Sequence, residues 1–187
     1  MWYRDGMSEA ALKLMDVDEF LASAEGREGK WELHDGAAVA MAPERALHVR
    51  VKTFAAIALL NAVRRAGAPC EALAEGMTVR IHARRAFVPD ACVLCPPPEP
   101  DDIETSTPLI VVEVLSPATA GFDHGAKLEG YFGLPSLVHY LLIDPDRRVL
   151  ILHSRGREGV IETRILREGE VRLDPPGLAF DVAELFG

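Results

Sequence analysis

The stretch Leu109-Ile-Val-Val-Glu-Val-Leu115 decides the fold that we predict for this chain. Its apolar, mostly β-branched residues run without alternation, which is typical of a strand buried on both faces. Such a strand lies at the centre of a sheet with a helix on each side. Glu113 is its only charged residue, and burying a lone carboxylate is costly unless it is paired, protonated or bound to a cation. The stretch therefore predicts both a central strand and a site.

The sequence on either side of this strand predicts an α/β or α+β fold with a mixed β-sheet flanked by helices. An N-terminal helix should open at a capping box formed by Asp16 and Glu19, and an Asp-Gly pair at 35–36 predicts a hairpin. Further strand-like runs cover residues 70–74, 77–82, 87–95, 138–143, 149–153, 160–166 and 170–173, and a second helix covers about 122–132.

A longer helix is predicted after Pro43-Glu44, where apolar residues recur at three- and four-residue steps. The members of this stripe are Leu47, Val51, Phe54, Ala58 and Ala62. Arg45, His48 and Lys52 fall on another face, which the pattern assigns to solvent. His48 has a second interpretation, a contact to phosphate or substrate.

Bulk properties suggest one folded domain over residues 1–187, because 49% of residues are hydrophobic and 26% charged. The start of the chain has no signal-peptide pattern, and no membrane association is expected. Three cysteines form an odd set. A zinc or redox role for Cys92-x-x-Cys95 lacks further ligands, so a small buried thiol is the preferred interpretation of Cys92. We expect a reducing, cytoplasmic location.

The net charge of -9 is unusual for a protein that binds nucleic acid. Residues 44–85 nevertheless hold eight Lys or Arg against three acids. This basic middle predicts either a positive face or an ordinary solvated surface, and charge alone does not separate the two.

Asp90 poses the same problem as Glu113, because it also lies in a mostly apolar run. If the two strands are neighbours, the carboxylates can converge on one cation, and oxygen ligands suit Mg²⁺ or Mn²⁺. On the following helix, Asp123, Lys127 and Tyr131 are spaced by four and share a face. Lys127 then serves as a catalytic cation, or else forms a surface ion pair with Asp123.

Several ordered motifs carry a family resemblance. They are Trp31-Glu-Leu-x-Asp-Gly36, Ala42-Pro43 with His48, Pro89-Asp90, Glu113-Val-Leu-Ser-Pro117 and Asp123-x-x-x-Lys127-x-x-x-Tyr131. From about residue 14 to about residue 150 the chain resembles the Uma-two family of restriction endonucleases, which belongs to the PD-(D/E)XK nuclease superfamily.

The resemblance implies a restriction-endonuclease-like core and metal-dependent phosphodiester cleavage, with Asp90 and Glu113 as metal ligands and catalytic residues together with Lys127. In the superfamily an acid from the N-terminal region can join the metal shell, and Glu32 matches it. An edge-strand carboxylate facing water is the alternative. Two departures are Leu115, where the superfamily lysine normally stands, and Val88, where an Arg often precedes Pro-Asp in the family.

These residues lead to the hypothesis of a Mg²⁺-dependent (or Mn²⁺-dependent) endodeoxyribonuclease-like hydrolase. Its partner is nucleic acid, DNA above all, and a homodimer is expected because a two-fold dimer cuts both strands of a duplex most simply. The alternative is a catalytically degenerate nuclease-fold module that binds nucleic acid or self-associates. A different metal-dependent hydrolase on the same scaffold is a third reading, since a fold does not fix the reaction.

Overall fold

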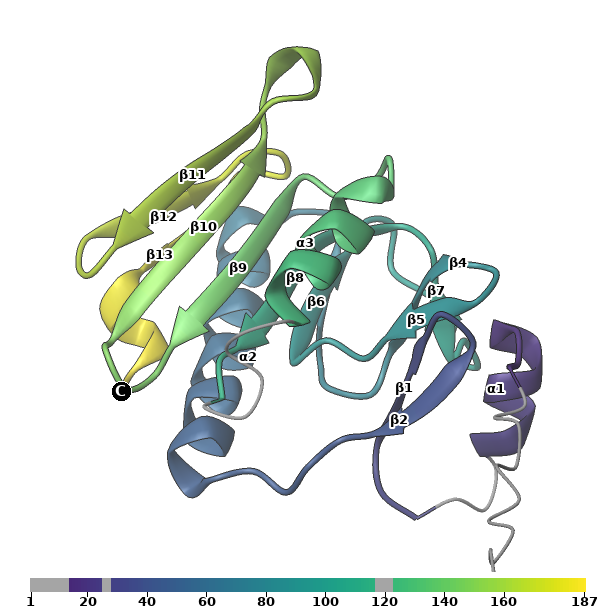
Figure 1. The fold of residues 1–187 in the computed structure, drawn as a ribbon. Coiled ribbons are helices and arrows are strands. Elements are labelled where there is room, and N and C mark those ends of the chain that lie inside the picture. Colours follow the sequence, from purple (N-terminus) through teal and green to yellow (C-terminus); the bar gives the residue numbers. More distant parts are fainter. Residues whose placement is uncertain (1–13, 25–27, 117–122) are drawn as a thin grey trace, which may run out of the picture.

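The structure is a computed structural model that describes residues 14–24, 28–116 and 123–187 (Figure 1). Within them the strands form a six-stranded sheet of order β11-β10-β9-β8-β6-β3, a five-stranded sheet of order β2-β1-β5-β4-β7 and the pair β12-β13. The strands are β1 (Trp31–His34), β2 (Ala37–Ala40), β3 (Glu71–Ala74), β4 (Thr78–His82), β5 (Arg85–Phe87), β6 (Ala91–Leu94), β7 (Glu104–Thr105), β8 (Pro108–Val114), β9 (His139–Asp144), β10 (Val149–Arg155), β11 (Ile161–Leu166), β12 (Glu170–Leu173) and β13 (Leu178–Asp181). The helices are α1 (Val17–Ala24), α2 (Ala46–Ala66) and α3 (Asp123–Gly133), with short 3-10 turns η1 (Arg157–Gly159) and η2 (Val182–Leu185).

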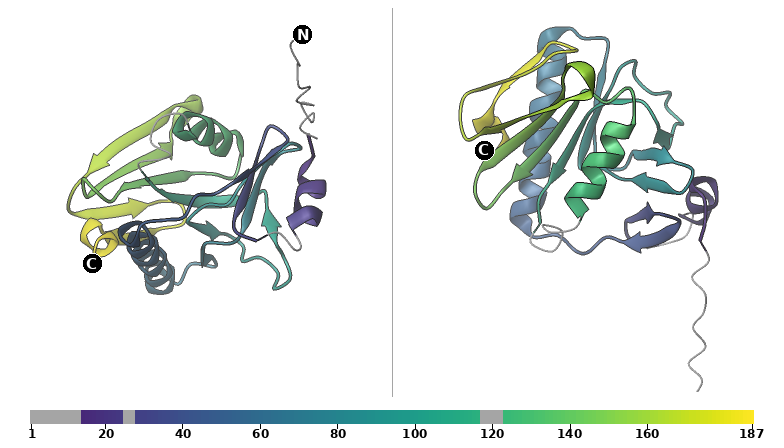
Figure 2. Two further views of the ribbon diagram at one scale, coloured as in Figure 1. Left: turned by 60° about the horizontal axis from the view of Figure 1, so that its bottom comes forward. Right: turned by 45° about the horizontal axis from the view of Figure 1, so that its top comes forward.

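Strand β8 is the predicted central strand. It pairs antiparallel with β6 and parallel with β9, so the sheet is mixed. Side chains of β8 alternate between two cores: Ile110 and Val112 pack in the cluster that contains the buried face of α2, and Val111 packs with α3. The two helices therefore cover opposite faces of the sheet (Figure 2). The predicted fold class is confirmed.

The N-terminal elements form as the sequence predicts. Glu19 N–H donates to Asp16 Oδ1 at 2.8 Å and Asp16 N–H donates to Glu19 Oε2 at 3.2 Å, which is the capping box of α1. Asp35 and Gly36 both have positive φ, at 49° and 90°, and form the two-residue loop between β1 and β2. Two left-handed residues match the twist of the hairpin, which explains the Asp-Gly pair.

The predicted strand at residues 87–95 is divided in the structure. β5 ends at Phe87 in the five-stranded sheet, and β6 begins at Ala91 in the six-stranded sheet. Pro89 lies between them and has no N–H to give to a ladder, so a single continuous strand is the wrong interpretation. Asp90 consequently lies where the chain crosses from one sheet to the other, with its N–H bonded to the Val112 carbonyl at 3.0 Å.

Helix α2 buries a stripe close to the predicted one. Val51, Ala58 and Ala62 are buried as expected, but Leu47 is 37% exposed, so the stripe begins one turn later than predicted. Among the described helices, α2 alone is long and apolar enough to cross a bilayer by length and composition, which the sequence had not suggested. Its buried face packs on the six-stranded sheet, and a core helix passes the same test.

The C-terminal strands β11 and β12 were predicted, whereas β13 and η2 were not. β12 pairs with β13 in a separate antiparallel ribbon, whose Val171 and Phe180 join the core cluster beneath α2. A capping box at Asp181 and Glu184 opens η2. The end of the chain therefore completes the α2 face of the core.

Helix α3 approaches the five-stranded sheet closely at Gly130. A Cβ built there would lie 3.0 Å from a ring carbon of Phe87 and 3.4 Å from Ile81 Cγ2. Phe87 is fully buried and has little room to retreat. The absence of a side chain at this position thus sets how deeply the helix lies against β4 and β5.

The cysteines differ in part from the prediction. Cys70 and Cys95, which flank the paired strands β3 and β6, form a disulfide, whereas the sequence favoured reduced thiols. Cys92 is a buried free thiol, as predicted, and burial raises its pKa to about 12. Cys92 and Cys95 do not act as a functional pair. They are three residues apart, an odd number, so their side chains point to opposite faces of the sheet.

Candidate active site

The predicted lysine on α3 lies among buried acids. Lys127 Nζ donates to Glu113 Oε1 at 3.1 Å and to Glu32 Oε1 at 2.9 Å, and Tyr131 OH donates to the same Glu113 oxygen at 2.8 Å. All four residues are buried. Lys127 is therefore not the surface lysine of the alternative interpretation. We call Glu32, Glu113, Lys127 and Tyr131 the Lys127 cluster.

Three elements bring the Lys127 cluster together. Lys127 and Tyr131 are one helical turn apart on α3, so both side chains leave the same face toward β8. Glu113 points to that face because it alternates with Val112 and Val114, which pack under α2. The side chain of Asp123, the third residue of the predicted face, lies outside the described part of the chain.

Glu32 comes from the other sheet. The sequence left open whether it faces water on an edge strand, and that alternative is wrong, since β1 lies between β2 and β5 and Glu32 is 4% exposed. Its carboxylate also accepts the Val88 N–H at 3.1 Å and the His34 Nε2–H at 3.0 Å. The backbone of Val88 thus also contributes a donor to the cluster.

Asp90 is bound on the other side of β8. Its Oδ1 lies 2.7 Å from Lys52 Nζ on α2, and its Oδ2 accepts the Val114 N–H at 2.6 Å. Because β6 begins only at Ala91, it does not extend along the end of β8, and on this edge side chains bind the Val114 backbone, while β9 pairs with the opposite edge. His48 Nε2 donates to the Val114 carbonyl at 2.6 Å. Asp90 and Glu113 are therefore neighbours, but their carboxylates are bonded to different lysines.

Lys52 is the centre of a second group of acids, which the sequence did not reveal. Its Nζ lies 2.8 Å from Glu44 Oε1, 2.5 Å from Glu75 Oε1 and 2.7 Å from Asp90 Oδ1. Oxygens of these three acids lie within 4.8 Å of one another, and Lys30 forms an ion pair with Glu75. We call Glu44, Lys52, Glu75 and Asp90 the Lys52 cluster.

Two residues that the sequence assigned to a solvated face are in fact buried. His48 is 5% exposed and Lys52 is 6% exposed. The helical pattern placed them off the apolar stripe correctly. It could not show that the acids facing them come from distant segments, and Glu44, eight residues before Lys52, was the only local sign.

Burial dominates the electrostatics of Glu113. It raises the pKa of Glu113 to about 8; the charges of Asp90 and Glu32 act in the same direction, while Lys127 and the Tyr131 hydroxyl oppose the rise. Burial also raises the pKa of Asp90, against the influence of Lys52. Glu32 differs, because its bonds to His34 and Lys127 outweigh burial and lower its pKa. Among these acids, Glu113 is the one whose charge is most costly without further positive charge nearby.

The basic middle of the chain is largely neutralised by acids. Of its eight Lys and Arg residues, Arg45, Lys52, Arg65, Arg80 and Arg85 form ion pairs. Arg45, which immediately precedes α2, pairs with Asp146 in the turn between β9 and β10. A broad positive face is therefore not a feature of this segment, and the ordinary solvated surface is the better description.

Comparisons with known proteins agree with this architecture. A crystal structure of a "putative nuclease belonging to DUF820" from Anabaena variabilis superposes with a TM-score of 0.71 at 20% identity, covering 92% of this chain and 97% of that one. At this identity the match establishes the fold.

Two uncharacterized proteins of Synechocystis sp. (strain PCC 6803) are similar in sequence. One, slr1290, is 28% identical over 78% of this chain and 76% of its own length. The other, sll1609, is 28% identical over 86% of this chain and 99% of its own length. The family model Uma2, described as "Putative restriction endonuclease", matches residues 17–183. With nearly the whole described chain inside that match, the protein belongs to the Uma2 family of restriction-endonuclease-like proteins.

Proposed function

We propose that this protein is a metal-dependent endonuclease that hydrolyses phosphodiester bonds in DNA. The observation that carries the proposal is the Lys127 amine between two buried carboxylates, Glu32 and Glu113, with Asp90 immediately before the adjoining strand β6. Membership of the family and the nuclease-like fold support the same reaction class. Asp90, Glu113 and Lys127 are the proposed catalytic residues.

The acids of this region fit a divalent cation. Asp90 and Glu113 would hold it, since carboxylate oxygens are the ligands preferred by Mg²⁺ and Mn²⁺. Mutual repulsion among Asp90, Glu32 and Glu113 contributes to the raised pKa of Glu113, and a cation would offset that repulsion. When bound, the ion would stabilise negative charge on the phosphate and promote ionisation of a water.

The residues of the chain have distinct proposed tasks. Lys127 would stabilise the charge that develops on the phosphate as water attacks phosphorus and the bond to the sugar oxygen breaks. Tyr131 would hold the Glu113 carboxylate in place through its hydroxyl, and Glu32 would hold the amine of Lys127. Being fully buried, Tyr131 acts as a positioning residue.

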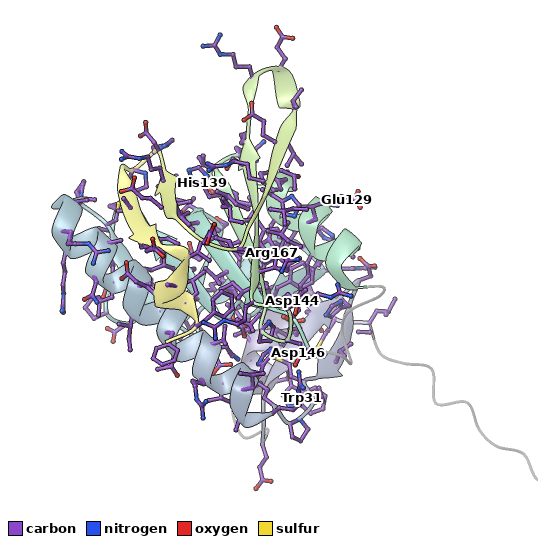
Figure 3. The ribbon with its side chains drawn as sticks, turned by 90° about the vertical axis from the view of Figure 1, so that its left-hand side faces the viewer. Trp31, Glu129, His139, Asp144, Asp146 and Arg167 are labelled. Carbon is purple, nitrogen blue, oxygen red and sulfur yellow. A yellow bond between two sulfur atoms is a disulfide. The ribbon has the colours of Figure 1, made fainter. Side chains whose placement is uncertain are left out.

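The test is cleavage of supercoiled plasmid by purified protein with Mg²⁺ or Mn²⁺. We expect nicked and linear products that EDTA suppresses, and a loss of at least about 100-fold in Glu113→Gln and Lys127→Met. The matched control is Glu129→Gln, an exposed acid on the same helix that stands away from the core in Figure 3. Equal cleavage by the wild type and both site variants would identify a contaminant and overturn the proposal.

Double-strand cleavage is simplest for a two-fold dimer, so we include a homodimer in the proposal. Light scattering should then give twice the 20.4 kDa mass of the chain. A monomer that only nicks would remove the dimer and leave the chemistry of the proposal intact.

A second candidate is a degenerate module that binds nucleic acid or self-associates. The neutralised basic segment and the lysine bonded to each proposed metal ligand favour it. Such a protein would shift DNA in a gel, or form oligomers, without cutting in any divalent metal. That result in a well-folded wild type would replace the nuclease with this candidate.

A further inference from the structure

The Lys52 cluster contains more acid than the proposed cleavage reaction needs. Asp90 is shared with the proposed active site, but Glu44 and Glu75 contact neither Glu113 nor Lys127 in any hydrogen bond or ion pair of the described residues. Glu44 precedes α2 and Glu75 follows β3, so two distant segments converge on the amine of Lys52. An arrangement of three carboxylates around one cation is the donor set of a divalent ion.

Charge in the Lys52 cluster is incompletely balanced. When ionised, Glu44, Glu75 and Asp90 carry three negative charges, against which Lys52 and Lys30 supply two positive ones. Asp90 is 4% exposed and cannot rely on water to screen it. A doubly charged ion would neutralise the group more completely than the Lys52 ammonium does.

His48 provides an independent observation. Its Nε2 must carry the proton, because its partner, the Val114 carbonyl, can only accept. In the neutral ring Nδ1 then presents a lone pair, and this buried atom has no hydrogen-bond partner among the described residues. It faces Glu44 Oε2 at 3.4 Å. A lone pair directed at a carboxylate oxygen is unfavourable unless a cation or a second proton lies between them.

The cluster opens onto a cavity that gives an ion access. The cavity measures about 470 Å³ and is lined by Lys30, Glu44, Lys52, Glu75 and Asp90 together with apolar residues of α2 and β3. One water occupies about 30 Å³ of liquid, so the space admits a hydrated ion. It also gives the Lys52 side chain room to move away from the acids.

We propose that Glu44, Glu75, Asp90 and His48 Nδ1 form a second divalent-cation site, and that Lys52 occupies it in the metal-free protein and is displaced when the ion binds. Carboxylate oxygens with one imidazole nitrogen suit Mn²⁺ best among the common ions of this class, because Mg²⁺ binds an imidazole nitrogen more weakly. The site shares Asp90 with the proposed active site, but it is tested by binding alone and does not require cleavage.

The main experiment measures Mn²⁺ binding by calorimetry with the full-length protein, without DNA. Lys52→Met should raise Mn²⁺ affinity at least about tenfold, because the competing ammonium is gone. Adding Glu44→Gln to Lys52→Met should abolish the gain. Arg50→Met is the matched control, since it removes one positive charge from an exposed position of the same helix. Unchanged or weaker affinity in Lys52→Met overturns the proposal.

Pulsed electron paramagnetic resonance of bound Mn²⁺ tests the nitrogen ligand. The wild type should show coupling to an imidazole nitrogen, and His48→Ala should lose that coupling while His34→Ala keeps it. If Lys52→Met fails to fold, Glu44→Gln in the wild-type chain must still lower Mn²⁺ affinity, and equal binding by the two proteins overturns the proposal.

Glu113→Gln separates this site from the proposed active site. The second site should keep its Mn²⁺ in that variant. The second site would be refuted if Glu113→Gln lost all Mn²⁺ binding while Glu44→Gln bound Mn²⁺ as the wild type does. That result would leave the proposed nuclease standing. The reverse result would support the second site even in a protein that cuts no DNA.

Discussion

Two buried lysines face acids on opposite sides of β8, and they differ in how much water reaches them. In the Lys127 cluster the side chains of Glu32 and Glu113 are 5% and 10% exposed. In the Lys52 cluster those of Glu44 and Glu75 are 19% and 29% exposed, beside a cavity. An enclosed acid depends wholly on its ion pair, whereas acids that reach water can exchange one cation for another.

Two lysines that look alike in the sequence have different proposed tasks. Lys127 is fixed by bonds to two buried acids, as a group that must be placed accurately for catalysis should be. Lys52 lines a cavity, into which we propose that it moves when an ion binds. Val114 links the two sides, because it follows Glu113 of the Lys127 cluster in the chain while its N–H donates to Asp90 and its carbonyl accepts from His48.

Removing each lysine in turn should give the largest difference in stability between the two clusters. Lys127→Met should lower the free energy of unfolding by about 3–5 kcal/mol, because it leaves Glu32 and Glu113 buried without their cation. Lys52→Met should lower it by only about 1–2 kcal/mol, because water in the cavity rehydrates the acids. Urea unfolding in EDTA, followed by circular dichroism, measures both. Equal losses would mean that the two clusters are equally closed.

The pH dependence of stability isolates Glu113. Its folded pKa, about 8, exceeds its ordinary value of 4.5, so below about pH 4.5 the carboxyl is protonated in both states and has no effect. As the pH rises toward 8, the unfolded chain releases the proton first and the folded state loses stability. The stability of Glu113→Gln relative to the wild type should therefore increase between about pH 5 and 8, by on the order of a few kcal/mol in the free energy of unfolding.

Thermal melts of the two metal-free proteins across that range measure this gain. A constant difference between them at every pH would show that Glu113 ionises normally in the folded protein. Excess Mg²⁺ should reduce the slope of the wild type, since bound cation favours the carboxylate.

Tyr131→Phe is the smallest change to the Lys127 cluster. It removes the hydroxyl that donates to Glu113 at 2.8 Å and leaves the ring in place. We expect a loss of about 1–2 kcal/mol in stability at neutral pH, and a pKa of Glu113 above that of the wild type, because one of the groups that lowers it is gone. Carbonyl infrared spectroscopy of the Glu113 side chain during a pH titration would measure the shift. A lower pKa would contradict the assigned hydrogen bond.

The parts of this molecule that were predictable are those set by local spacing. The apolar run around Glu113 identified the central strand, and the four-residue step from Lys127 to Tyr131 placed both on one face of α3. These patterns depend only on the repeat of the helix or the strand. The apolar run around Asp90 identified this acid in the same way, and its proposed role is still a prediction.

The parts that were missed depend on contacts between distant segments. Glu75 and Asp90 reach Lys52 only after β3 and β6 are paired, and no periodicity records that pairing. The sequence left open whether Glu32 faces water, because strand order is not visible in a sequence. Pro89 was the one available sign that the run at 87–95 contained two strands.

The position of the Lys127 amine depends on the absence of a side chain at Gly130. The helix that carries Lys127 can lie close to β5 because Gly130 has no Cβ, and the Phe87 ring lies against that position. A larger residue at 130 would press on the Phe87 ring, and if the ring does not shift, α3 and the amine of Lys127 must move away from the sheet. Redesign of this scaffold therefore has wide freedom on the outer side of α3 and almost none at one small position underneath it.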